Sequence, residues 1–101
     1  MAIEYLKFFV SPELREKFIE TDREIWTSAL AKYPGFLSKE VWINPEIPEE
    51  IIIIARWKTR QEWKAIPIDI LEAIEREFAA SMGENEYKLV ESKEYQVRKF
   101  P

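Results

Sequence analysis

The hydrophobic residues of this chain recur with two different periods, and each change of period marks the end of one element. Two segments, Ile3–Val10 and Ile51–Trp57, have the period of a strand and are apolar on both faces, until Arg56 in the second. Two more, Phe36–Ile43 and Tyr87–Phe100, are strand-like but contain charged residues, which is typical of the edges of a sheet. We therefore predict four strands, of which the first and third along the chain are central.

The first helix is predicted between Pro12 and about Tyr33. Ser11 suits the N-cap position in front of it, with Pro12 at the first helical position. Pro34 and Gly35 end the helix. Apolar residues recur at helical spacing along one broad side of this segment and charged residues along the other, so the helix is expected to cover a sheet.

The second helical region is predicted to begin after Thr59. Thr59 and Glu62 have the spacing of a capping box, in which each side chain bonds to the backbone N–H of the other residue. A short turn that carries Trp63 should follow, and Pro67 is expected to break or re-cap it. The main helix then continues until Gly83, which suits a left-handed C-cap.

The order of these elements, β-α-β-β-α-β, predicts one α+β domain over residues 1–101, a ferredoxin-like sandwich with a four-stranded antiparallel sheet and two helices on one face. Two helices cover only one face, whereas the central strands are apolar on both, so the other face needs a second apolar surface. We predict that a second copy of the chain supplies it in a homodimer with the sheets face to face, and that Trp42 or an aromatic residue of the first strand lies at the seam. The alternative is that the last strand or a loop folds over that face.

Composition excludes several classes of function. Histidine and cysteine are absent from the 101 residues, which removes disulfides, thiolate metal sites and the commonest general base, and no cofactor or metal is expected. The net charge of -4 argues against nucleic acid as a partner. The longest apolar run, Ile51–Ala55, is far shorter than the ~20 residues that span a bilayer, and the chain does not begin with a signal pattern. We expect a cytoplasmic protein without a membrane partner.

Two short stretches, together with the order of elements, carry a resemblance to a known family. Tyr33–Phe36 contains Pro-Gly-Phe before the second strand, and Arg56–Trp63 contains Trp-Lys-Thr and a further tryptophan after the third. In these features the chain resembles the dimeric α/β-barrel superfamily, which includes the antibiotic biosynthesis monooxygenase-like proteins. The resemblance covers nearly the whole chain and implies a dimeric α/β barrel.

Two further observations limit what this resemblance implies about activity: a closer likeness to a group without an assigned reaction, and the lack of residues that some enzymes of the superfamily use. Ser11–Phe18 and the tail Glu94–Pro101 resemble a group of uncharacterised small proteins common in cyanobacteria, and this likeness supplies a fold without a reaction. Haem-degrading members of the superfamily use a histidine on the second helix and an asparagine on the first strand. This chain has no histidine, and its first strand has no asparagine, which argues against haem degradation.

Asp22 is the most unusual residue of the first helix. Its helical angle places it on the apolar side, close to Trp26, and a buried carboxylate needs a partner or a shifted pKa. One interpretation is that Asp22 faces a ligand cavity between the helix and the sheet, with Trp26 as a wall. The other is that Asp22 is paired with Arg15 or Arg56, or is tilted to the rim.

Arg56 and Trp63 are two further candidates for binding a ligand. Arg56 continues the alternation of Ile52 and Ile54, which is expected to face inward, and an arginine there suits an anionic ligand. The alternative for Arg56 is an ion pair with a neighbouring strand, for which Glu40 is a suitable partner. Trp63, like the other large aromatic residues, either lines a pocket for a planar ligand or fills the core or the dimer interface.

These observations favour a homodimeric protein that binds a small apolar or aromatic molecule between its helices and its sheet. One alternative is a cofactor-independent, monooxygenase-like enzyme for a polycyclic or quinone-type substrate, in which Asp22 or Arg56 assists with proton transfer or anion stabilisation. A third possibility is a structural partner in an assembly. A cavity of several hundred cubic ångströms that reaches Asp22 and Trp26 would favour the first two.

Overall fold

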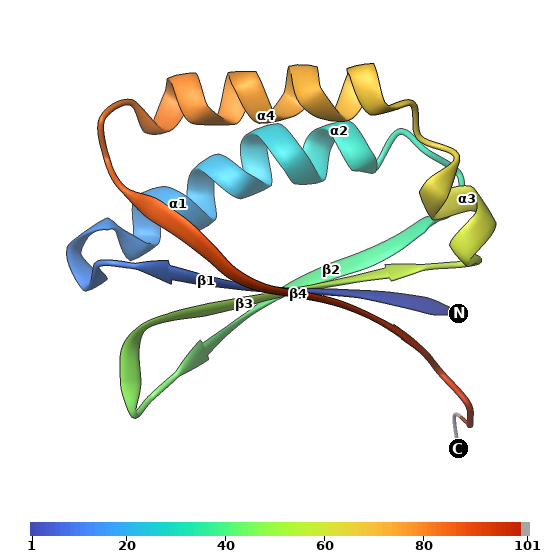
Figure 1. The fold of residues 1–101 in the computed structure, drawn as a ribbon, viewed down its shortest axis with the longest axis horizontal. Helices are drawn as coiled ribbons and strands as arrows, with labels where there is room; N and C mark the ends of the chain where they lie inside the picture. Colours follow the sequence, from blue (N-terminus) through green and yellow to red (C-terminus); the bar gives the residue numbers. More distant parts are fainter. Residues whose placement is uncertain (100–101) are drawn as a thin grey trace.

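The computed structural model describes residues 1–99, and its elements follow the predicted order β-α-β-β-α-β (Figure 1). The four strands are β1 (Ala2–Val10), β2 (Phe36–Asn44), β3 (Ile47–Trp57) and β4 (Tyr87–Gln96). The first helical region consists of a 3₁₀ turn (Pro12–Leu14), α1 (Arg15–Asp22), a π-helical segment (Arg23–Thr27) and α2 (Ser28–Leu30). The second consists of α3 (Arg60–Lys64) and α4 (Ile68–Met82).

The sheet has the strand order β2-β3-β1-β4, and all neighbouring strands are antiparallel. The α+β ferredoxin-like fold is therefore confirmed, with the doubly apolar strands β1 and β3 in the centre and the charged strands at the edges. Ala55 of β3 pairs with Glu4 of β1 on one side and with Lys39 of β2 on the other. Glu4 in turn pairs with Glu94 of β4, so these four residues form one row across the sheet.

Both helical regions lie on the same face of the sheet, so the chain forms two layers (Figure 1). The core between the layers has two clusters. One cluster surrounds Phe18, Ile51 and Ile53, and the other surrounds Ala55 and Trp57. Because successive residues of a strand face opposite sides, the odd-numbered residues of β3 face the helices and the even-numbered residues face away from them.

The outer face is the side of the sheet that points away from the helices, and it carries Ile52 and Ile54 of β3. Among residues 1–99 no helix or loop covers this face, and β4 lies beside β1 as an edge strand without folding across it (Figure 1). Three large aromatic residues remain about half exposed here, namely Phe9, Trp42 and Tyr95. The alternative in which the last strand covers this face is therefore not seen in the described part of the chain.

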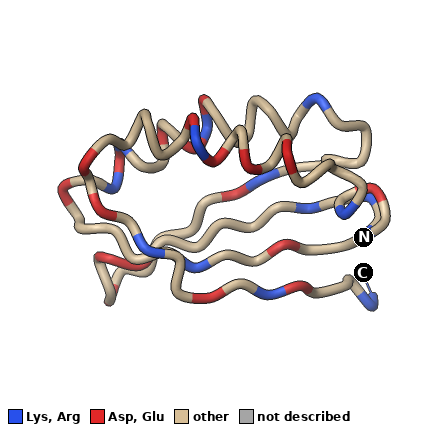
Figure 2. Tube along the Cα trace, turned by 45° about the horizontal axis from the view of Figure 1, so that its top comes forward, with Lys and Arg blue, Asp and Glu red and all other residues tan. Residues whose placement is uncertain are grey.

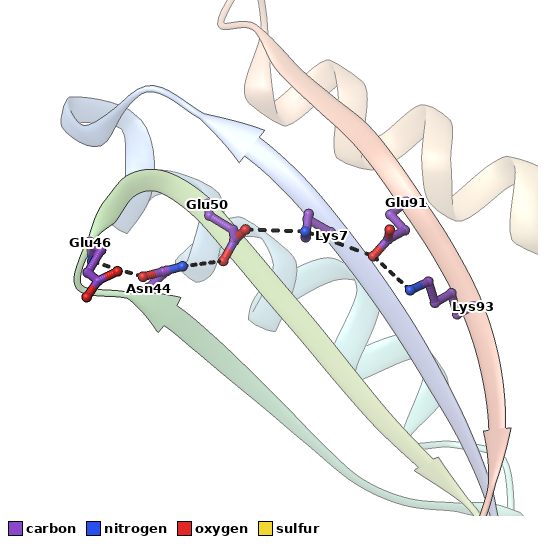
Figure 3. A network of polar contacts seen from close by, with 6 residues as sticks. All are labelled: Lys7, Asn44, Glu46, Glu50, Glu91 and Lys93. Atoms are coloured by element: carbon purple, nitrogen blue, oxygen red, sulfur yellow. Dashed lines mark hydrogen bonds and ion pairs between the residues drawn. The ribbon is translucent and has the colours of Figure 1, made fainter.

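A chain of polar contacts crosses the outer face near the β2–β3 hairpin (Figure 3). Lys7 Nζ lies 3.4 Å from a carboxylate oxygen of Glu50 and 4.0 Å from one of Glu91. Glu50 also accepts a hydrogen bond from the side-chain amide of Asn44 at 3.0 Å, and Lys93 Nζ lies 3.4 Å from Glu91. Contacts between side chains therefore connect all four strands on this side.

The β2–β3 hairpin is tighter than the sequence predicts. Strand β3 begins at Ile47, not at Ile51, because the loop contains only Pro45 and Glu46. The side chain of Asn44 stabilises this loop by accepting a hydrogen bond from the backbone N–H of Glu46 at 2.9 Å. The predicted strands, which end at Ile43 and begin again at Ile51, leave residues 44–50 as a turn; this longer turn is wrong, and both strands extend further from the core.

The ends of the helices agree with the predictions only in part. Thr59 accepts a hydrogen bond from the backbone N–H of Glu62 at 3.0 Å, so the predicted N-cap is present, but the Glu62 carboxylate accepts a hydrogen bond from the Thr59 hydroxyl at 3.2 Å and not from its backbone N–H as in a capping box. Gly83 follows α4 with a positive φ of 66°, but its ψ of -132° lies outside the predicted left-handed helical conformation. Ser11 occupies the N-cap position, but its side chain makes no capping hydrogen bond. Strand β4 ends before Phe100, which lies outside the described residues.

Charged residues are spread over both layers, with lysines and arginines separated by acidic residues along the trace (Figure 2). Within residues 1–99 no helix is both long enough and apolar enough to cross a membrane.

Candidate functional site

A cavity of about 270 Å³ lies between the helices and the sheet. This volume corresponds to about nine water molecules and lies just below the usual size of small-molecule pockets. Most of the lining side chains are apolar, and the charged ones gather around the row that contains Ala55. The residues that line the cavity are Glu4, Leu6, Phe8, Asp22, Trp26, Leu30, Lys39, Ile53, Glu75, Phe78, Tyr87 and Leu89.

The small side chain of Ala55 opens space at the polar end of the cavity. Glu4 on β1 and Lys39 on β2 flank Ala55 in the same row, and both face the helices. Neighbouring strands are about 4.8 Å apart, so the backbones of Glu4 and Lys39 are separated by roughly 10 Å with only a methyl group between them. The two long polar side chains therefore border a gap beneath the helices.

Asp22 reaches into this gap from the end of α1 and binds Lys39. The Nζ atom of Lys39 lies 2.9 Å from Oδ1 and 2.8 Å from Oδ2 of Asp22, and both side chains are less than a tenth exposed. Burial raises the pKa of the Asp22 carboxyl above its ordinary value of 3.8, and the ammonium of Lys39 opposes that rise. The expectation that Asp22 is paired is confirmed, but its partner is Lys39 and not Arg15 or Arg56.

Glu4 has a weaker set of partners than Asp22. One of its carboxylate oxygens accepts a hydrogen bond from the indole Nε1 of Trp57, and this bond is long at 3.4 Å. Within residues 1–99 no lysine or arginine nitrogen comes within 4.0 Å of the Glu4 carboxylate. Lys39, which lies in the same row, is paired with Asp22 instead. Burial raises the pKa of the Glu4 carboxyl above 4.5, opposed by the Trp57 bond and by the positive charge of Lys39.

The π-helical segment directs three residues of the first helical region to the cavity. Asp22, Trp26 and Leu30 are each four residues apart, and all three line the cavity. In a regular α-helix, each would be rotated by about 40° from the one before it. The wider π turn at Arg23–Thr27 offsets this rotation, so the predicted regular helix is wrong at this point. Single π turns of this kind are frequent at functional sites.

Tyr87 and Glu75 form the second polar group of the cavity lining. The hydroxyl of Tyr87, at the start of β4, donates a hydrogen bond of 3.2 Å to the carboxylate of Glu75 on α4. Burial raises the pKa of the Tyr87 hydroxyl, and the charge of Glu75 adds to this rise. This contact ties α4 to the edge strand β4 beside the cavity.

The four ligand-binding candidates predicted from sequence divide into two pairs. Asp22 and Trp26 come together at the cavity, while Arg56 and Trp63 do not line it. The expectation that Arg56 faces inward is wrong, because the odd-numbered residues of β3 face the core, and Arg56 forms an ion pair with Glu40 on the outer face, as its alternative interpretation predicts. Trp63 packs in parallel against Trp57, with ring centroids 6.3 Å apart.

Sequence reasoning missed Glu4 and Lys39. Glu4 carries a detectable signal, because it is the one charged residue on the side of β1 that otherwise holds Ala2, Leu6, Phe8 and Val10. Lys39 carries none, because lysine is common on edge strands and only the register places it opposite Asp22. That Asp22 and Trp26 bind a ligand stays a prediction.

The fold and the cavity define a class: a two-layer α+β protein that encloses a small apolar space with a carboxylate–lysine pair at one end. The family model described as antibiotic biosynthesis monooxygenase matches residues 1–66 of this chain. The chain belongs to that family. Among proteins with curated descriptions, none matches it significantly.

Several solved structures share the fold over nearly the whole chain. SnoaB, a cofactor-independent oxygenase from Streptomyces nogalater, is 14% identical with a TM-score of 0.70, and the match covers 98% of this chain and 94% of SnoaB. The ActVA-Orf6 monooxygenase of Streptomyces coelicolor, in complex with the ligand nanaomycin D, is 20% identical with a TM-score of 0.69, covering 99% and 91%. A conserved protein from Methanosarcina mazei is 21% identical with a TM-score of 0.64, covering 97% and 94%. At these identities the likeness concerns the fold.

Proposed function

We propose that this protein binds a small, mostly apolar molecule in the cavity between its helices and its sheet. The cavity itself is the observation that carries the proposal, because protein interiors are normally packed without voids larger than a water molecule. Its volume of about 270 Å³ accommodates a molecule of roughly ten non-hydrogen atoms, such as one or two fused rings. Trp26, Phe8 and Phe78 give it aromatic walls.

The position of the polar groups supports a ligand with one polar end. Glu4, Asp22 and Lys39 gather at the Ala55 row, whereas Phe8 lies four residues from Glu4 on the same side of β1. At about 3.4 Å per residue this separates the polar end from the aromatic end by roughly 14 Å. A molecule with a polar group at one end and a ring at the other matches this arrangement.

A homodimer is the second part of the proposal, with a second copy of the chain on the outer face. On this side the central strands carry apolar residues such as Ile52 and Ile54 beside the charged pair Lys7 and Glu50, and Trp42 and Tyr95 remain about half exposed within the described residues. Two copies that meet by these faces would form a barrel of two sheets with the helices outside. The cavity lies on the other side of the sheet, so binding and pairing use different surfaces.

An oxygenase activity without a cofactor is the candidate that the family match favours. In this alternative a polycyclic or quinone-type substrate occupies the cavity and reacts with molecular oxygen. Glu4, whose pKa is raised by burial, is suited to take a proton from the substrate as a general base. Oxygen consumption by the wild type but not by Glu4→Gln would support this activity over simple binding.

Calorimetric titration with methylnaphthalene tests the binding proposal. Leu6→Phe adds volume inside the cavity and should weaken binding at least tenfold, while the protein stays folded by circular dichroism. Leu37→Phe is the matched control, because Leu37 is exposed and lies outside the cavity lining. Failure of the wild type to bind, or equal binding by wild type and Leu6→Phe, would contradict the proposal.

A further inference from the structure

The charged residues that line the cavity do not balance. Three carboxylates, those of Glu4, Asp22 and Glu75, face one ammonium, that of Lys39, which leaves a formal excess of two negative charges. Lys39 is already held by both oxygens of Asp22. Glu75 is exposed, so water screens its charge, whereas Glu4 is only partly exposed and its charge is screened less.

Glu4 therefore lacks the partner that an enclosed carboxylate requires. Burying a charged group is unfavourable unless an opposite charge and hydrogen bonds compensate it. Within residues 1–99 Glu4 has only the 3.4 Å bond from Trp57 and no cation within 4.0 Å, and the positive charges of Lys39 and Lys64 act on it from a greater distance. Its carboxylate lines the cavity, so a ligand in the cavity is in a position to supply both.

We propose that the ligand is an apolar amine, and that its protonated amino group forms an ion pair with Glu4 at the Ala55 row. The proposal rests on the binding function proposed above and names the chemical class of the ligand. The ring of such an amine would extend from Glu4 past Leu6 toward Phe8, between Trp26 and Phe78. The aromatic walls also interact favourably with a cation.

Other classes of ligand fit these charges less well. An anionic ligand would add a third uncompensated negative charge and would meet Lys39 only by displacing Asp22. A neutral alcohol can donate a hydrogen bond to Glu4, but it leaves the excess charge in place. A hydrocarbon fills the apolar part and leaves Glu4 as it is.

Four ligands with the same ring distinguish these classes: naphthylmethylamine, naphthylmethanol, methylnaphthalene and naphthoate. Their dissociation constants are measured by calorimetry at neutral pH with the wild type, Glu4→Gln and a control, Glu20→Gln. Glu20 is exposed on α1, is paired with Arg23 and does not line the cavity. The wild type should bind the amine at least tenfold more tightly than the alcohol and the hydrocarbon, with naphthoate the weakest.

Glu4→Gln should remove most of this preference while its affinity for methylnaphthalene stays within about twofold, and Glu20→Gln should behave as the wild type does. Equal affinity of the wild type for amine and alcohol, or an unchanged preference in Glu4→Gln, would overturn the proposal. Absence of binding by all four ligands would instead show that the binding function itself fails. If Glu4→Gln does not fold, the pH dependence of the wild type decides, because amine binding should weaken as Glu4 is protonated at low pH.

Discussion

Lys39 on the edge strand β2 and Asp22 at the end of α1 form an ion pair with nitrogen–oxygen distances of 2.8 and 2.9 Å, and fewer than a tenth of either side chain's area is exposed. The two residues are 17 apart in sequence and join the helical layer to the sheet. The stability that each of these buried charges contributes depends on the other, because their ion pair is the main interaction that offsets the cost of removing both charges from water.

Asp22→Asn should therefore lower the free energy of unfolding by about 3 kcal/mol, because it leaves the ammonium of Lys39 enclosed without its main partner. The double variant with Lys39→Met should recover most of that loss, since no charge then remains uncompensated. Urea unfolding at pH 7 measures both. A loss in the double variant that equals the sum of the two single losses would show that the pair has no mutual dependence.

The pH dependence of stability should reveal the raised pKa of Glu4. A carboxyl whose pKa is higher in the folded state contributes stability below its ordinary value of 4.5, and that contribution is lost as the pH rises through the folded-state pKa. Glu4→Gln has no carboxyl at this position, so it does not lose stability in this way as the pH rises. Its free energy of unfolding should therefore increase relative to the wild type as the pH is raised from 4 to 7.

Glu94→Gln is the control of opposite sign for this measurement. The hydrogen bond from Arg60 lowers the pKa of Glu94, so the wild type loses this contribution as the pH falls below 4.5. Glu94→Gln should therefore become less stable relative to the wild type as the pH rises from 3 to 4.5. A constant difference between Glu4→Gln and the wild type across pH 4–7 would argue that Glu4 is not enclosed.

The proposed dimer predicts a particle of twice the 12.1 kDa chain mass in light scattering at micromolar concentration. Trp42→Glu places a charge on the outer face and should shift the particle to the monomer mass. Ile68→Glu is the matched control, because Ile68 is more exposed than Trp42 but lies on α4, on the opposite side of the sheet. A monomeric wild type, or a dimer that survives Trp42→Glu and not Ile68→Glu, would contradict pairing by this face.

Gly35 is held against α3, and this contact explains the glycine between Pro34 and Phe36. A Cβ atom at position 35 would lie 2.6 Å from Cβ of Glu62, and the carbonyl of Gly35 accepts a hydrogen bond from Lys58 at 2.8 Å. Gly35→Ala should therefore cost about 1–3 kcal/mol of stability through overpacking. A thermal melting curve identical to that of the wild type would show that α3 moves freely away from this position.

Gly83→Ala offers a comparison with a different physical cause. A Cβ atom there would have no neighbour within 4 Å, but the positive φ of 66° is strained for any residue with a side chain. With a ψ of -132° this conformation is sparsely populated by residues other than glycine, so the expected cost is about 1–3 kcal/mol from backbone strain alone. A larger loss of stability in Gly35→Ala than in Gly83→Ala would show that the steric contact with Glu62 costs more than the backbone strain at position 83.

The fold could be predicted from sequence because its signals are local. Strands β1 and β3 are apolar on both faces, which marks them as central, and Thr59 with Glu62 marks the start of α3 within four residues. The π-helical segment could not be predicted in this way. The apolar residues of this segment keep the spacing of a regular helix, and the wider turn depends on how the helix packs against the sheet.

The candidate site could be predicted only in part, for a related reason. Asp22 is noticeable because it interrupts an apolar helix side, but its partner Lys39 lies on an edge strand where a lysine is ordinary. Their meeting depends on the register that places Lys39 and Glu4 on either side of Ala55. The side of the sheet that Arg56 faces also depends on register, because a shift of one residue exchanges the two faces.

The most direct test of the central claim, that the cavity between helices and sheet is a ligand site, is a crystal structure of the protein with naphthylmethylamine. We expect electron density for the ring between Trp26 and Phe78, with the amino group within hydrogen-bond distance of the Glu4 carboxylate. Density for the ring only on the outer face, or a cavity closed by its own side chains, would contradict the claim.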